Sequence, residues 1–153
     1  MPLTRATSPE RAILSQALRA IRRRRGLRVK DVALAMGLPL RTYQNFEAGR
    51  TELDYGRIQA FARVTDSDPN AILMAVMLGS PGFALHTLEN KLTGALLIGL
   101  RRFDERMGER MARIEVGRLI VAFRRAFDDL EAEANARDDQ AAAWFRDPPT
   151  RGS

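Results

Sequence analysis

The chain has 153 residues, with 25 lysines and arginines against 19 aspartates and glutamates, and a formal net charge of +6 at pH 7. It contains no cysteine, which excludes disulfides, thiolate metal ligands and cysteine nucleophiles. The single histidine, His86, cannot complete a zinc site and removes the commonest general base. We therefore expect neither an enzyme, nor a metal site, nor a cofactor.

The excess positive charge is confined to the first half of the chain. Residues 1–75 hold 13 bases and 7 acids, whereas residues 76–153 hold 12 of each. This asymmetry is typical of a polyanion-binding module joined to a neutral second region. No cleavable signal sequence is visible, and the most apolar run, residues 92–100, has about half the ~20 residues that a membrane span needs. We expect a soluble, cytoplasmic protein that does not enter a membrane.

The first predicted helix follows a short arm, residues 1–8, that we expect to be flexible. Ser8 offers a capping hydroxyl, and Pro9 suits the first helical position. The helix ends in four arginines, residues 22–25, of which we expect only Arg22 to face inward. The apolar positions that indicate this helix are Ile13, Leu14, Ala17, Leu18 and Ile21.

Residues 29–51 have the layout of a helix-turn-helix. A first run of apolar residues with helical spacing ends at Gly37, which can adopt the positive φ typical of a helix end. Pro39 then pre-sets φ for a second short helix, residues 40–48, which Gly49 stops. Such a unit inserts its second helix into the major groove of DNA. The apolar residues with this spacing are Val32, Ala33, Met36, Tyr43 and Phe46.

Two further helices complete a five-helix domain over residues 9–78. Asp54 and Asp68 each precede one of these helices and can cap it. Residues 79–82, Gly-Ser-Pro-Gly, are predicted to be a linker because they cannot continue a helix.

The second half is helical by period. Apolar residues step by three or four positions along two successive stripes. The simplest interpretation is a helical hairpin of residues 83–107 and 109–137, and one long helix bent near Val116 and Gly117 is the alternative. Residues 138–153 lack a clear helical spacing of apolar residues and are predicted to be a mostly flexible tail.

We interpret residues 83–137 as an oligomerisation or partner-binding region, because its stripes hold more apolar surface than one hairpin can hide. In the tail, Trp144 and Phe145 either fold back as a lid on the core or serve as a docking peptide, and burial tendencies favour the lid. The residues expected to support self-association are Leu88, Leu92, Leu96, Leu100, Phe103, Leu119, Phe123 and Phe127.

An ordered set of residues in the first half is specific enough to indicate a family. Its members are Leu27, Val32, Ala33, Met36, Gly37, Thr42, Tyr43, Phe46, Glu47, Gly49, Arg50, Thr51, Ile58 and Ala62. In this set the chain resembles the Xre, or lambda-repressor-like, helix-turn-helix family over about residues 9–78. The resemblance implies an all-α fold, with an N-terminal five-helix lambda-repressor-like DNA-binding domain followed by the C-terminal helical hairpin.

The outer face of the second helix, residues 40–48, carries the candidates for base contacts. Arginine can grip guanine O6 and N7, while glutamine and asparagine can pair with adenine N6 and N7. The resemblance implies base contacts at the same positions, although the family often has a polar residue where Leu40 stands. Ordinary surface residues are the alternative. The base candidates are Leu40, Arg41, Gln44 and Asn45, and the phosphate candidates are Arg28, Lys30, Arg50, Thr51 and Arg57.

The resemblance also implies a buried ion pair, here between Arg22 and Glu47, that holds the second helix in orientation. Two independent surface charges are the alternative. Taken together, the sequence predicts a sequence-specific transcription regulator that inserts residues 40–48 into the major groove of double-stranded DNA.

We expect the protein to act as a homodimer on a palindromic operator, through its C-terminal helices. The alternative partner of these helices is a different protein such as RNA polymerase. An antitoxin-type autoregulator, and a co-activator whose C-terminal helices bind RNA polymerase or another regulatory protein, are the alternative functions. A pure adaptor that no longer binds DNA is disfavoured by the excess positive charge of the first half and by the presence of Arg41, Gln44, Asn45 and Arg50.

Overall fold

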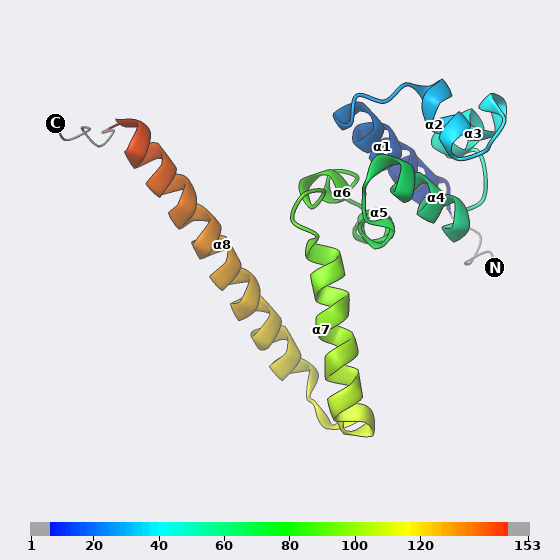
Figure 1. Cartoon of the computed structure of the whole chain (residues 1–153). Helices are drawn as coiled ribbons and strands as arrows, with labels where there is room; N and C mark the ends of the chain where they lie inside the picture. The colour runs from blue at the N-terminus through cyan, green and yellow to red at the C-terminus, as the bar shows by residue number, and fades with distance from the viewer. Residues whose placement is uncertain (1–6, 147–153) are drawn as a thin grey trace. The chain divides into compact units, whose positions relative to one another are not determined.

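The computed structural model describes residues 7–146, which form helices and turns and contain no strand (Figure 1). The chain divides into two compact units, residues 1–103 and 104–153. The all-α fold is thus confirmed for the described residues. The elements are α1 (Ser8–Arg24), α2 (Val29–Ala35), α3 (Leu40–Glu47), α4 (Tyr55–Thr65), α5 (Pro69–Leu78), α6 (Phe83–His86), α7 (Leu92–Met107), the 3₁₀ helix η1 (Gly108–Arg113) and α8 (Val116–Arg146).

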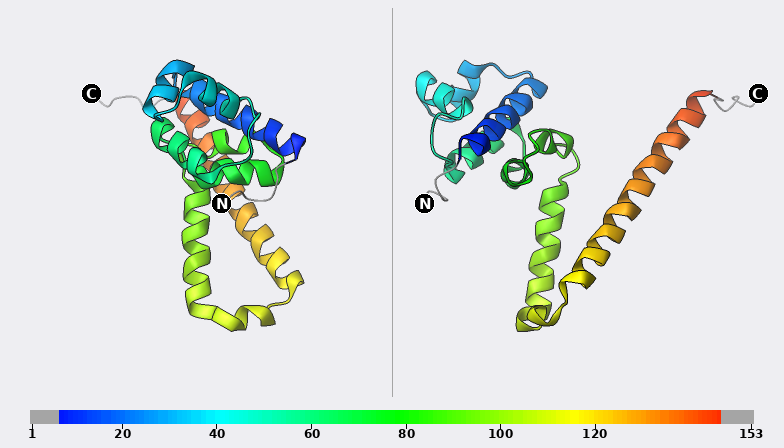
Figure 2. Two further views of the ribbon diagram at one scale, coloured as in Figure 1. Left: turned by 90° about the vertical axis from the view of Figure 1, so that its right-hand side faces the viewer. Right: turned by 180° about the vertical axis from the view of Figure 1, so that it is seen from behind.

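The first unit is built around α1, which contacts α3, α5 and α6 (Figures 1 and 2). Leu14, Leu18 and Ile21 lie on one face of α1 and are buried in the core. Phe46 of α3 and Phe61 of α4 meet edge to face in the same core, with 6.4 Å between ring centroids. One apolar core therefore holds the first five helices together.

Thr7 caps α1, which corrects the prediction of Ser8 as the cap. The hydroxyl of Thr7 accepts a hydrogen bond from the backbone N–H of Glu10, and the Glu10 carboxylate accepts one from the N–H of Thr7 at 2.6 Å. The bonds from the Thr7 N–H and hydroxyl lower the pKa of Glu10. Ser8 is instead the first helical residue, and residues 1–6 of the predicted arm lie outside the described residues.

Beyond the predicted linker at residues 79–82 the chain stays packed against the first five helices. Gly79 ends α5 with a φ of 64°, in the left-handed region that glycine favours. The short helix α6 follows and contacts both α1 and α5. Ala84 and Leu88 are buried in the same core. Leu88 therefore lies inside this unit and not on the free face that its expected role in self-association requires.

The helix predicted over residues 83–107 is interrupted before Leu92. Lys91 adopts a left-handed φ of 55°, and the Asn90 side chain accepts a hydrogen bond from the backbone N–H of Leu92 at 3.0 Å. These local bonds offer the backbone a turn in place of a helix. Because Leu88 and Leu92 keep the four-residue step across the break, the apolar pattern alone predicted one continuous helix.

The second long helix also differs from the prediction of residues 109–137. Gly108 ends α7 with a φ of 49°, and the 3₁₀ helix η1 follows. Ile114 then adopts an extended backbone (φ −82°, ψ 120°), so α8 begins only at Val116. The structure has neither the predicted helix start nor the alternative of one long bent helix.

At its other end α8 continues through residues 138–146, which the sequence placed in a flexible tail (Figure 2). Trp144 and Phe145 are exposed on this helix, so the predicted lid is wrong. Residues 147–153 lie outside the described residues. In the described range, every helix is too short or too polar to cross a membrane.

Leu88→Ala should destabilise the protein by ~2–5 kcal/mol, because truncating a buried leucine removes apolar contacts and leaves a cavity. Leu78→Ala is the matched control, since Leu78 is 57% exposed and its truncation should cost no more than ~0.5 kcal/mol. Urea unfolding of both full-length variants, followed by circular dichroism, measures the two free energies. Equally small losses would place Leu88 outside the core.

Candidate nucleic-acid interface

A glycine turn joins α2 and α3. Gly37 has a φ of 66° and donates its N–H to the carbonyl of Leu34 at 3.0 Å. Leu38 donates to the carbonyl of Ala33 at 2.9 Å, so both bonds satisfy carbonyls at the end of α2. Pro39 is the capping residue of α3, where its missing N–H removes no helical bond. The turn predicted from the sequence is therefore present.

The inner face of α3 is fixed in the core by its aromatic residues. Tyr43 and Phe46 are buried, with ring centroids 6.2 Å apart. Burial raises the pKa of Tyr43 well above its ordinary value, and the nearby Glu47 carboxylate raises it further, so the phenol stays neutral. Rotating α3 about its axis would expose both rings to water. This packing determines which residues of α3 face outward.

An ion pair also ties the C-terminal end of α3 to α1. Arg22 Nε donates to Glu47 Oε1 at 2.6 Å, and the two side chains are 13% and 7% exposed. Arg22 Nη1 donates to the carbonyl of Leu27 at 3.1 Å. The predicted pair of Arg22 and Glu47 is thus present. A single guanidinium connects α1, the segment before α2, and α3.

The outer face of α3 carries the predicted base-contact residues. Leu40, Arg41 and Gln44 are exposed, and Asn45 is half-buried at the edge of this face. The backbone carbonyl of Asn45 also accepts a hydrogen bond from the backbone N–H of Arg50 at 3.0 Å. Within residues 7–146, Arg41 makes no ion pair, so its guanidinium is available to a ligand. The structure brings three of the four candidates together on an accessible surface.

Gly49 sets the direction in which the chain leaves α3. Its φ is 68°, and a Cβ at this position would lie 2.4 Å from the carbonyl oxygen of Arg11 in α1. Only glycine tolerates both the conformation and the close approach. Arg50 follows directly and is exposed, whereas Thr51 is half-buried. The position of Arg50 at the exit of α3 is therefore imposed by contact with α1.

Two of the predicted phosphate-contact arginines pair with neighbouring carboxylates. Arg28 Nε lies 2.7 Å from Asp31 Oδ2, and Arg57 Nε lies 3.7 Å from Asp54 Oδ2. Pairs this accessible to solvent contribute little free energy, so a phosphate can compete with the carboxylate. Lys30 is exposed on α2.

The structure corrects the prediction that Arg25 faces solvent. Its guanidinium donates to the carbonyls of Thr65 and Asp66 at 2.9 and 2.7 Å, and to the carboxylate of Glu89 at 2.9 Å. Helix ends leave carbonyls without helical partners, and Arg25 satisfies two of them at the end of α4. Nothing in a run of four arginines distinguishes this residue from its neighbours. Arg25 therefore could not be identified from the sequence as a structural residue.

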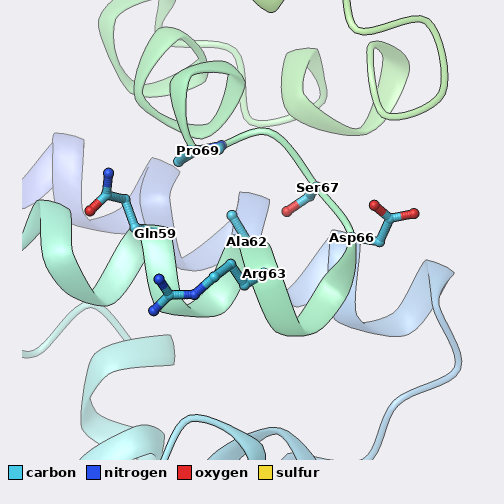
Figure 3. Close-up of a pocket in the computed structure, with 6 residues that line it drawn as sticks. All are labelled: Gln59, Ala62, Arg63, Asp66, Ser67 and Pro69. Atoms are coloured by element: carbon cyan, nitrogen blue, oxygen red, sulfur yellow. The ribbon is translucent and has the colours of Figure 1, made fainter.

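A pocket lies along α4 and the turn into α5 (Figure 3). Gln59 and Arg63 extend from α4 beside it, and both are exposed, as is Asp66. These side chains are free to move in solvent, so they offer a ligand few fixed contacts, and we assign the pocket no part in the site. The lining residues are Gln59, Ala62, Arg63, Asp66, Ser67 and Pro69.

Comparison with known proteins identifies one part of the chain. A family model described as "Helix-turn-helix" matches residues 18–72, from the middle of α1 into α5. A search of the curated proteins found no match, and neither did a search of the solved structures. The matched span contains α2, α3, the glycine turn, and both partners of the Arg22–Glu47 pair.

Glu47→Ala should destabilise the protein by ~3–5 kcal/mol, because it leaves the guanidinium of Arg22 largely buried without its partner. Glu47→Gln should cost less, since the amide oxygen can still accept the bond from Arg22 Nε. Glu52→Ala, at an exposed position, is the matched control and should change stability by no more than ~0.5 kcal/mol. Chemical unfolding measures all three. A Glu47→Ala variant as stable as the Glu52 control would contradict the role of the pair.

Proposed function

We propose that this protein, whose residues 18–72 form a helix-turn-helix domain of the Xre, or lambda-repressor-like, family, is a sequence-specific DNA-binding transcription regulator. The observation that carries the proposal is the accessible outer face of α3, opposite an inner face fixed by Tyr43, Phe46 and Glu47. A short helix held in this way enters the major groove. The positive charge of the first half attracts the phosphate backbone.

The residues on this face can distinguish bases. Arg41 can donate two hydrogen bonds to guanine O6 and N7, and Gln44 can pair with adenine N6 and N7. Leu40, 47% exposed, suits an apolar contact with a thymine methyl group. Asn45, at the edge of the face, has less access to the groove. Arg41 and Gln44 are therefore the principal reading residues of the proposal.

The flanks of α2 and α3 would hold the phosphate backbone. Arg50 is the strongest candidate because its position at the exit of α3 is set by Gly49. Thr51 and Lys30 extend the contact on either side, and Arg28 can exchange its carboxylate partner for phosphate. Contacts of this kind fix the register of the protein on the duplex and carry no sequence information directly.

We further propose that the protein binds a palindromic operator as a homodimer. One face of α8, here named the α8 stripe, exposes large apolar side chains whose burial would stabilise an interface. α7 adds Leu96 and Leu100, which are exposed, with Phe103 half-buried. Leu88 has no part in the proposed interface, because it lies in the core. The stripe runs from Val116 to Trp144, and its large apolar residues in the first half of the helix are Val116, Ile120, Phe123, Phe127 and Leu130.

The two classes of DNA contact respond differently to substitution. Arg41→Ala should cost ~1–3 kcal/mol at one base position and relax specificity there. Arg50→Ala should weaken specific and non-specific DNA alike and reduce the salt slope by about one unit. The measurement is a titration at several salt concentrations, on an operator selected from random duplexes by the protein itself.

Arg101→Ala is the matched control for that titration. It removes one exposed arginine from α7, outside the helix-turn-helix domain, and should leave both affinity and salt slope unchanged. If Arg41→Ala and Gln44→Ala both bound the operator as tightly as the wild type, α3 would not be the reading helix.

Phe123→Glu tests the α8 stripe in the full-length chain. A carboxylate within the stripe cannot be buried without a partner, so this variant should be monomeric. It should bind a palindrome at least about tenfold more weakly than the wild type, because the two half-sites no longer bind together. Val121→Glu, 57% exposed but on the opposite side of α8, is the matched control and should remain dimeric. Sedimentation shows whether only the first variant dissociates.

A further inference from the structure

We propose that two copies of α8 pair antiparallel along the α8 stripe, in one register that the flanking charges select. This inference rests on the proposed homodimer, because it assigns the geometry of that interface. In the structure the stripe is exposed along α8, from Val116, which is 73% exposed, to Trp144, which is 56% exposed. A second copy of this chain is the partner that the charge pattern fits.

The stripe has the spacing of a coiled coil. Its members alternate steps of four and three residues, so the pattern repeats every seven residues along α8. Seven residues in two turns correspond to 3.5 residues per turn, compared with 3.6 in a straight α-helix. This repeat keeps the same row of side chains facing a partner helix over its full length. At Arg137 the stripe carries a long side chain whose stem can pack while its guanidinium reaches out, as it does now to Glu133 at 2.8 Å. The members in order are Val116, Ile120, Phe123, Phe127, Leu130, Ala134, Arg137, Ala141 and Trp144.

Charges are segregated along α8. Arg118, Arg124 and Arg125 lie in its first third, where there is no acid. Residues 128–139 hold six acids and one arginine. Two copies of such a helix side by side and parallel would place like charges at the same level. Two antiparallel copies place the basic part of each against the acidic part of the other.

The residues that border the stripe decide between the two directions. One border carries Arg124, Glu131 and Asp138, and the other carries Ala126 and Glu133. In a parallel pair, a residue on the Glu133 border of one copy faces a residue on the Arg124 border of the second copy. The facing residue has a sequence number higher by five. Glu133 would then face Asp138 of the second copy, and symmetry would repeat this repulsion. The borders therefore disfavour a parallel pair.

In an antiparallel pair each border meets the same border of the second copy. With Phe127 packed against Leu130 of the second copy, Arg124 of each copy meets Glu131 of the other. In this register the large ring of Phe123 faces the small Ala134, which suits close packing. The structure leaves Arg124 and Glu131 exposed on α8, available for these pairs.

The same residues disfavour the two neighbouring registers. Sliding one copy by seven residues in one direction sets Arg124 against Arg124 of the second copy. Sliding it in the other direction places Arg124 against Asp138, but it also sets Glu131 against Glu131 and Glu133 against Glu133. Like charges at an interface cost free energy, and of these three registers only the one with Phe127 against Leu130 has no repulsive pair on either border.

Charge exchange in the full-length protein tests the pairing. Arg124→Glu alone and Glu131→Arg alone should each raise the dimer dissociation constant by about tenfold at low salt, since two attractive pairs become repulsive. The double variant Arg124→Glu/Glu131→Arg should return to within about twofold of the wild type, because attraction is restored. Sedimentation equilibrium gives the constants, and circular dichroism checks that α8 stays helical in each variant.

Disulfide trapping gives a second readout, because the chain has no cysteine of its own. An equal mixture of Ala126→Cys and Glu133→Cys chains should form a cross-linked heterodimer, since these positions adjoin in the antiparallel register. Glu133→Cys mixed with Asp138→Cys is the matched control, because these two positions adjoin only in a parallel pair and should not cross-link.

These experiments separate the antiparallel pairing from the homodimer itself. A dimer that cross-links in the parallel combination, or whose double variant stays as weak as the single variants, overturns the antiparallel pairing and leaves the homodimeric regulator standing. A monomeric wild-type protein, with no cross-link in either pair of cysteine variants, would leave a different protein or α7 of the same chain as the partner of the stripe. That result overturns the proposed homodimer as well.

Discussion

The accessible face of α3 depends on an ion pair that is almost removed from water, between Arg22 and Glu47. Taking two charges out of water is costly, and their attraction offsets that cost only when the geometry is good and the remaining donors are satisfied. Here Nε reaches the carboxylate at 2.6 Å, and Nη1 reaches the carbonyl of Leu27. Buried ion pairs of this kind generally add little net stability over well-packed apolar side chains of the same volume. The pair instead fixes the orientation of α3, because both charges stay bonded only when the C-terminal end of α3 keeps its position against α1.

Much of this site could be predicted from the sequence, because its inner and outer faces follow the helical period. Tyr43 and Phe46 fall on one side of an eight-residue helix, and Arg41 and Gln44 fall on the other. A helix packed on one side must turn its polar residues outward, so the partition needs no knowledge of the tertiary structure. The resemblance to a known family supplied Arg22 and Glu47, which lie 25 positions apart. Periodicity alone would not have paired them.

The features that the sequence did not reveal depend on local hydrogen bonds. In each case a neighbouring residue or another backbone conformation could fit the sequence pattern nearly as well. Thr7 and Ser8 both carry a hydroxyl, and the choice between them rests on Glu10, which stands at the right distance only for Thr7. That spacing was available as a signal. Asn90 and Lys91 break a helix whose apolar pattern continues through them, so tertiary packing of α6 overrode the period. Arg25 is fixed by backbone carbonyls, which carry no sequence signature.

Charge has different roles in the two proposed binding surfaces of the chain. The first half holds an excess of arginine that a polyanion can neutralise. In α8 the positive and negative charges nearly balance, but the basic residues lie near its N-terminal end and the acidic residues lie further along. Such a distribution favours one direction of a partner helix over the other. In the antiparallel register, the two copies of Val116 stand about 38 Å apart along the pair, at a rise of about 1.5 Å per residue. A parallel pair would instead begin its two α8 helices side by side, so the distance between the two α8 N-termini distinguishes the two arrangements.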